Sequence, residues 1–151
     1  MSALGDATIL EALLPKAMAV LFPPREEDPL RHHSIGQIRL MRALLGGSRS
    51  AGDLSASLGL SPSSLTQMAA RMIHAGLVCK DSDDHDRRVR KLSLTSSGKL
   101  LMEHRRGIRA QMAAEALDHL EPEKRALLIE LMIEIASISP ARERILAEVT
   151  V

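Results

Sequence analysis

The chain has 151 residues, 45% of them hydrophobic and 26% charged, which is ordinary for one folded globular domain and excludes a disordered chain. Phe22 is the only aromatic residue, so the protein has no aromatic platforms for stacking single-stranded nucleic-acid bases. The formal net charge is +1, which excludes a general polycation, so that any nucleic-acid site must come from locally clustered charges.

The N-terminal part of the chain predicts a helix and a connector. Apolar residues recur at helical spacing over residues 6–22. Pro15 lies inside this stretch and removes a backbone hydrogen bond, so we expect a kink or a break near Leu14. Residues 23–33 contain prolines, opposed charges and few apolar side chains, which is typical of a connector.

Three further helices are marked by their caps. The first begins after Ser34 and ends at Gly46 and Gly47, where glycine stops the helix. A short helix capped by Ser50 ends at Gly59, and a third begins at Ser61-Pro62, a cap followed by a first-turn proline. The last two helices are separated by a tight turn, which is the layout of a helix-turn-helix.

The helix that starts at Ser61 has two different faces. Leu65, Ala69, Met72 and Ile73 are spaced to form one buried face. The opposite side carries small, polar and basic side chains of the kind that read base edges or hold phosphates in a major groove. These are Ser63, Gln67, Ala70, Arg71 and His74, flanked by Ser64 and Thr66.

Two short strands follow, over residues 77–80 and 89–94, with a charged hairpin tip over 81–88. Cations gather on this hairpin, where they could contact phosphates or a minor groove; they are Arg87, Arg88, Arg90 and Lys91. Two long helices then cover residues 96–120 and 121–138. The last has an apolar stripe too wide to face water, which predicts a homodimer.

The predicted fold is therefore mostly α (α+β). A winged helix-turn-helix DNA-binding domain with a two-stranded wing covers residues 34–95. Residues 1–33 and 96–151 form a helical dimerisation region on either side of it.

A longer motif carries a family resemblance. Gly76-Leu77-Val78, followed by the run from Asp86-Arg87-Arg88 to Leu94-Thr95-Ser96-Ser97-Gly98, resembles the signature of MarR-type regulators. The resemblance covers residues 34–98 in detail and the flanking helices in layout only. It implies a homodimer on a pseudo-palindromic operator in double-stranded DNA, acting as a repressor that a small ligand or other signal relieves.

The resemblance also implies roles for individual residues. Arg88 would enter the minor groove, oriented by Asp86, while Arg87, Arg90 and Lys91 would lie near phosphates. A small-molecule pocket would draw on Phe22, Arg31, His32, His33 and Met41, although Met-rich linings also suit a core. The recognition helix would present Ser61, Ser63, Ser64, Thr66, Gln67 and Arg71.

The winged helix, Cys79 and the histidine pair each have an alternative interpretation. A winged helix can serve as a protein-interaction module without specific DNA readout, and an arginine-rich hairpin can be only a solvated surface. Cys79, the single cysteine, could sense oxidants, but a thiol in a strand is more often buried and inert. His32 and His33 could bind a metal with Glu26, Glu27 or His104, although adjacent histidines rarely share one ion.

Several functions find no support in the sequence. There is no glycine-rich phosphate loop, no H-E-x-x-H metal motif and no nucleophile elbow, so we expect no enzymatic activity and no cofactor. A lone cysteine, no recognisable signal peptide and no long uncharged apolar segment lead us to expect a cytoplasmic protein.

Overall fold

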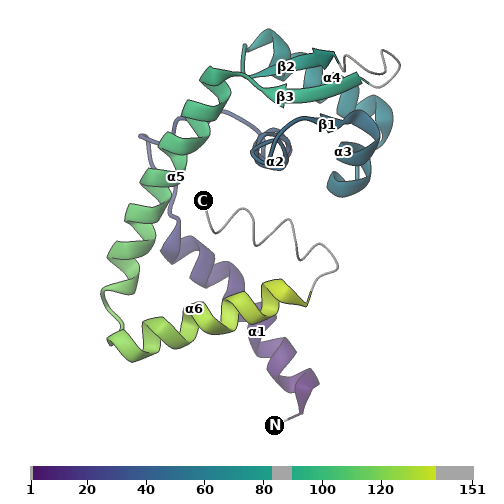
Figure 1. Ribbon diagram of the computed structural model, residues 1–151. Helices are drawn as coiled ribbons and strands as arrows, with labels where there is room; N and C mark the ends of the chain where they lie inside the picture. Colours follow the sequence, from purple (N-terminus) through teal and green to yellow (C-terminus); the bar gives the residue numbers. More distant parts are fainter. Residues whose placement is uncertain (1, 83–89, 139–151) are drawn as a thin grey trace.

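The computed structural model describes residues 2–82 and 90–138, and within them the chain is mostly helical (Figure 1). This confirms the predicted mostly α, winged-helix fold class. The helices are α1 (Ala3–Leu21), α2 (Ile35–Ala43), α3 (Ala51–Leu58), α4 (Pro62–His74), α5 (Ser96–Leu117) and α6 (Pro122–Ser137). The strands are β1 (Arg49–Ser50), β2 (Val78–Ser82) and β3 (Arg90–Leu94).

The elements form two regions joined by α5. The winged lobe consists of α2, β1, α3, α4, β2 and β3, gathered at the top of Figure 1. Helix α5 runs away from this lobe, and α1 and α6 lie toward its far end. No helix in the described part of the chain is long and apolar enough to cross a membrane.

The sheet has three strands, in the order β1-β3-β2, and both pairings are antiparallel. The two predicted wing strands are present as β2 and β3, and β1 adds a third strand that was not predicted from the sequence. Strand β1 was missed because two residues carry no alternating pattern. It forms because Ser50 caps α3 and adopts the extended backbone that a cap requires, with φ −67° and ψ 151°, which lets it pair with Lys91.

The hydrophobic core lies almost wholly in the winged lobe. It also recruits Leu30 from the connector and Met102 from α5, both beyond residues 34–95. The inner faces of α2, α3 and α4 meet the sheet there, so each helix is held by its own buried stripe. The core residues are Leu30, Leu40, Met41, Leu44, Leu54, Leu58, Leu65, Ala69, Met72, Leu77, Val78, Leu92, Leu94 and Met102.

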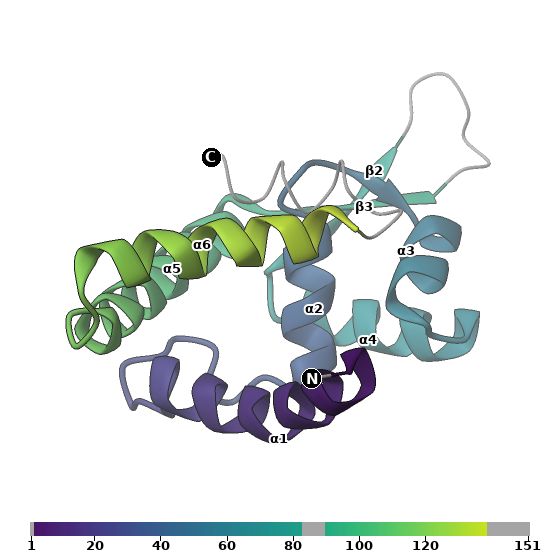
Figure 2. The ribbon, with the colours of Figure 1, turned by 90° about the horizontal axis from the view of Figure 1, so that it is seen from below.

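Of the kink or break expected near Leu14, the break is absent. Helix α1 runs unbroken from Ala3 to Leu21 with Pro15 inside it, and Figure 2 shows it as one helix. A proline removes one hydrogen bond from a helix. Residues 11–20 are all exposed, so the carbonyl that loses its partner can be hydrated instead, which keeps the cost of the lost bond low.

Candidate nucleic-acid interface

The turn between α3 and α4 is closed by local hydrogen bonds. Gly59 adopts the left-handed conformation, with φ 66° and ψ 37°, and ends α3. The N–H of Leu60 then donates to the carbonyl of Ser55 at 3.0 Å. Ser61 starts α4 as its cap, with Pro62 in the first turn. The predicted helix-turn-helix is thus present with the predicted caps.

Helix α4 has the two faces that its sequence predicts. Leu65, Ala69 and Met72 are buried against the core, and Ile73 is half-buried. Because these residues hold α4 from one side only, the opposite side is left on the surface. The exposed residues of that side include Ser63, Thr66, Gln67, Ala70, Arg71 and His74.

Three serines form a hydroxyl cluster at the N-terminus of α4. The Ser61 Oγ accepts the backbone N–H of Ser64 at 3.2 Å, and it lies 3.1 Å from the Ser63 Oγ. The same Ser61 hydroxyl donates to the Ser64 Oγ at 2.8 Å. Ser61 is therefore engaged in capping, which uses the hydrogen-bonding capacity that a base contact would need.

The polar side chains farther along α4 differ in their engagement. The Thr66 hydroxyl donates to the carbonyl of Pro62 at 2.8 Å, within the helix itself. Gln67 and Arg71 are exposed, and no other residue of the ranges 2–82 and 90–138 hydrogen-bonds to either side chain. Of the predicted base readers, Gln67 and Arg71 therefore have the most donors and acceptors to offer a ligand.

The wing is described only near its base. Ser82 pairs with Arg90 and Asp81 with Lys91, which holds the ends of β2 and β3 together. Lys91 is half-buried in the central strand β3. Asp86, Arg87 and Arg88 lie outside the described residues, so their predicted contacts remain predictions.

One cation near the wing was not selected from the sequence. Arg49 lies in β1, is half-buried, and pairs through its backbone with Leu92 of β3. An isolated arginine after two glycines carries no periodic signal. It becomes a neighbour of the wing only because the tertiary fold adds β1 to the sheet.

Comparisons with known proteins bear on this fold. No family model matches the sequence, and no curated protein matches it. Among solved structures, a MarR-like transcriptional regulator from Thermotoga maritima superposes with a TM-score of 0.67 at 20% identity, covering 91% of this chain and 96% of that one. Wild-type MarR from E. coli gives a TM-score of 0.65 at 19% identity, covering 89% and 98%.

A third structure is BpsR from Bordetella bronchiseptica, solved to explain how 6-hydroxynicotinic acid regulates its DNA binding. It superposes with a TM-score of 0.60 at 19% identity and covers 87% of this chain and 98% of that one. The likenesses span nearly the whole of each neighbour. This chain has the fold of the MarR-family regulators. The predicted resemblance is confirmed at the level of the fold.

The residues predicted to line a ligand pocket in this MarR-type fold have different surroundings. Met41 is fully buried in the core of the winged lobe. Arg31 and His32 are exposed, and the Arg31 Nε donates to the His32 Nε2 at 2.9 Å. His33 is half-buried, and its Nδ1 is buried without a hydrogen-bond partner. Phe22 is half-buried, with the Arg109 guanidinium 3.7 Å from its ring centroid.

Cys79 is the candidate for a redox-sensing thiol, and the histidines are the candidates for a metal site. The Cys79 Sγ is half-buried and lies 3.2 Å from the Ser93 Oγ, its cross-strand partner. Over residues 2–82 and 90–138, no three His, Cys, Asp or Glu side chains are grouped closely enough to hold a metal ion. The surroundings of Cys79 and of the histidines in the described residues therefore do not support the hypotheses of an oxidant sensor and of a metal site.

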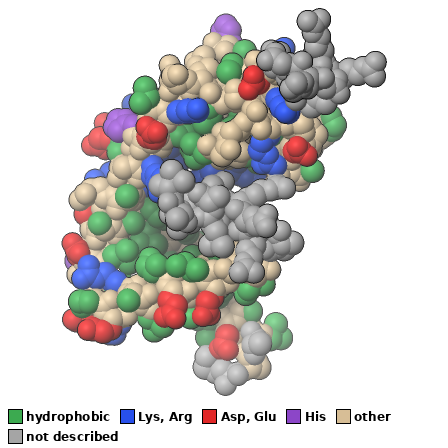
Figure 3. Space-filling model, in the orientation of Figure 1, with side chains coloured by type: hydrophobic (Ala, Val, Ile, Leu, Met, Phe, Trp, Pro, Cys, Tyr) green, Lys and Arg blue, Asp and Glu red, His purple; other side chains and the backbone are tan. Residues whose placement is uncertain are grey.

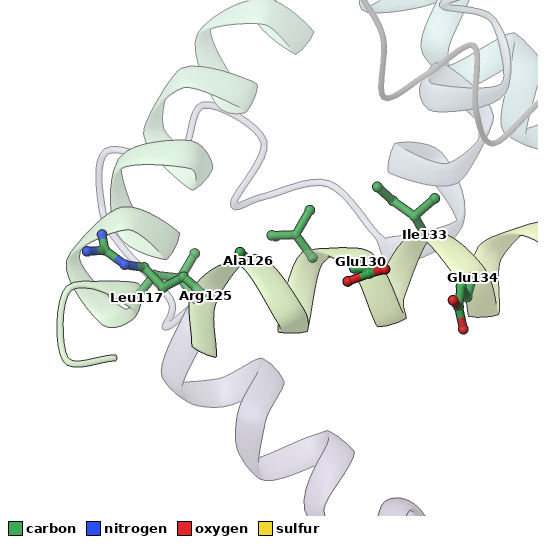
Figure 4. A pocket seen from close by; sticks show the side chains of 7 residues that line it. Leu117, Arg125, Ala126, Glu130, Ile133 and Glu134 are labelled. Atoms are coloured by element: carbon green, nitrogen blue, oxygen red, sulfur yellow. The ribbon is translucent and has the colours of Figure 1, made fainter. Parts of the chain in front are cut away.

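A groove lies away from the winged lobe, at the end of α5 and along α6 (Figure 4). Its volume is about 660 Å³, and its surface is almost entirely apolar. None of the predicted ligand residues lines it. Figure 3 shows hydrophobic side chains gathered over α6 and the neighbouring part of α5. The groove is lined by Leu117, Arg125, Ala126, Ile129, Glu130, Ile133 and Glu134.

Proposed function

We propose that this protein is a dimeric, sequence-specific regulator of transcription that binds double-stranded DNA. The observation that carries the proposal is the exposed polar and basic face of α4, with Gln67 and Arg71 unengaged in the described structure. A helix of this kind fits the major groove, and its side chains match those that read base edges and hold phosphates. The adjacent β2–β3 hairpin supplies the wing, the second DNA-contacting element of a winged helix.

Exposed apolar surface supports the dimer. Helix α6 buries no residue in a single chain, and seven of its large apolar side chains or those just after it are at least 45% exposed. Helix α1 is also exposed along almost its whole length. Such a surface is covered in a stable soluble protein, and a second copy of the chain would cover it symmetrically. The seven residues are Leu127, Ile129, Leu131, Met132, Ile133, Ile135 and Ile138.

The charge distribution supports a local rather than a general DNA contact. The net charge of +1 leaves little overall attraction for DNA. Arg71 lies near the end of α4, and the sequence adds Arg87 and Arg88 in the predicted wing tip, outside the described residues. A dimer doubles these contacts on a two-fold site.

We further propose that the protein is a repressor relieved by a small ligand, and that it is not an enzyme. The support for ligand relief is the fold shared with BpsR, whose DNA binding responds to 6-hydroxynicotinic acid. The fold alone does not name a ligand for this chain, because function resides in sites that differ within one fold.

The first test is selection of bound duplexes from a random pool by the purified full-length protein. We expect enrichment of a two-fold symmetric sequence. Replacing Arg71 with alanine should then cost about 1–3 kcal/mol of binding, or relax preference at one position of each half-site. Lys124→Ala is the matched control, because this exposed cation belongs to α6, a helix that lies far from α4 in Figure 1. Absence of any enriched sequence would favour a protein-interaction module instead.

A second test addresses the wing. Arg88→Ala should weaken binding strongly, and a lost phosphate contact should reduce the slope of log affinity against log salt by about 1. The measurement is a salt titration on the selected duplex, with Lys124→Ala as reference again. Unaltered affinity and slope for Arg88→Ala would remove Arg88 from the interface.

A further inference from the structure

The connector between α1 and α2 is tied to α5 by ion pairs, and it runs beside that helix in Figure 1. Both carboxylate oxygens of Asp28 accept from the Nε of Arg105 at 3.1 Å. The side chains of Arg105 and Asp28 are only 12% and 19% exposed. Asp28 Oδ1 also accepts the backbone N–H of Leu30 at 2.9 Å, and Leu30 is fully buried in the core. Asp28 therefore links α5 to Leu30, the connector residue whose side chain is buried in the core of the winged lobe.

Two more arginines surround this ion pair. Arg109, one turn farther along α5, is half-buried against the ring of Phe22. Burial lowers the pKa of Arg109, and the positive charges of Arg105 and of Arg42 on α2 lower it further, whereas the Asp28 carboxylate opposes them. The Asp28 carboxylate thus acts on two guanidinium groups of α5, by direct contact with Arg105 and at longer range on Arg109.

This arrangement makes Asp28 different from the other ion pair of the connector. The Arg25 Nη2 lies 2.6 Å from the Glu115 Oε2, but both side chains are 39% or more exposed. Exposed pairs contribute little because water screens them. Removing the charge of Asp28 would instead leave the largely buried Arg105 without its partner. It would also leave the repulsion of Arg109 by Arg105 and by Arg42 of α2 without the carboxylate that opposes it.

We propose that Asp28 is a positioning residue, which fixes the winged lobe against α5 and thereby sets the distance between the two recognition helices of a dimer. The inference rests on the proposed function, because such a distance matters only where two copies bind one duplex. Each added base pair moves the half-sites apart by about 3.4 Å along the helix axis and rotates one relative to the other. A rigid dimer should therefore accept one spacing and reject its neighbours.

The test compares wild type with Asp28→Asn, which removes the charge and keeps the shape. The duplexes are the one selected by wild type, versions with one base pair added or removed between the half-sites, and a single half-site. We expect wild type to bind the selected spacing at least about tenfold more tightly than either altered spacing. Asp28→Asn should reduce this ratio to below about threefold while leaving half-site affinity unchanged.

Controls separate the possible results. Arg25→Gln removes the exposed ion pair and should keep the wild-type ratio, whereas Asp28→Glu, which restores the charge, should recover most of it. An unchanged ratio in Asp28→Asn would overturn the proposal, and an equal loss in Arg25→Gln would overturn the assignment to Asp28. A uniform loss of affinity on all duplexes would show a merely structural role, and would also overturn it.

Two further outcomes are distinguishable. If Asp28→Asn loses its helical circular dichroism signal, Arg105→Gln is tested in its place. The spacing preference of Arg105→Gln should fall only part of the way, since Asp28 can still act on Arg109. An unchanged ratio there would again overturn the proposal. If the wild-type protein enriches no duplex at all, the proposed function is contradicted together with the role of Asp28. If it binds DNA without preferring one half-site spacing, only the role of Asp28 is contradicted.

Discussion

Replacing Leu131 and Ile135 of α6 together with aspartate is expected to convert the proposed dimer into a monomer. Both side chains point away from the chain's own core, with 46% and 55% of their surface exposed. Burying one such side chain contributes about 1.5–3 kcal/mol, and a two-fold interface contains each residue twice. A charge in its place would also have to be desolvated, so the dissociation constant should rise at least about a thousandfold.

Sedimentation velocity across a range of protein concentrations measures this change. Lys124→Asp is the control, because it introduces the same residue at an exposed position in the first turn of α6, where a negative charge is favourable. The double variant should also lose tight binding to the full operator. A variant that remains dimeric at wild-type concentrations would show that α6 does not form the interface.

Gly98→Ala is expected to destabilise the winged lobe by about 3 kcal/mol or more, because overpacking against a fixed backbone is costly. A Cβ on Gly98 would overlap the carbonyl oxygen of Leu77. That carbonyl cannot move away easily, since it accepts the N–H of Thr95 at 3.1 Å. The Thr95 hydroxyl, which caps Gly98, donates to the carbonyl of Gly76 at 2.7 Å, so the contact is held from both sides.

Thermal and urea unfolding followed by circular dichroism would measure the loss. A chain of this size loses about 2–4 °C of Tm for each kcal/mol. Gly107→Ala is a matched control in the same helix, because a Cβ there meets nothing within 4 Å. That substitution should stabilise the protein by about 0.5–1 kcal/mol through helix propensity. Equal effects of the two substitutions would contradict the close-contact explanation.

Local signals in the sequence were enough to predict the central elements. Ser50, Gly59 and Ser61 mark the ends of α3 and the start of α4, since capping depends on neighbours a few residues away. The spacing of Leu65, Ala69 and Met72 predicted the buried face of α4 and hence its exposed polar side. The candidate DNA-reading residues follow from that periodicity, whereas their contacts with bases do not.

By itself, then, the sequence determined the winged helix-turn-helix, the polar face of α4 and the wide apolar stripe of α6, because each depends on caps, turn residues or spacings only a few residues apart in the chain. Only the tertiary structure decided the pairing of β1 with β3, the continuity of α1 through Pro15 and the meeting of Asp28 with Arg105, 77 residues apart in the chain. Contacts of that range depend on how separate elements pack, and no local spacing encodes them.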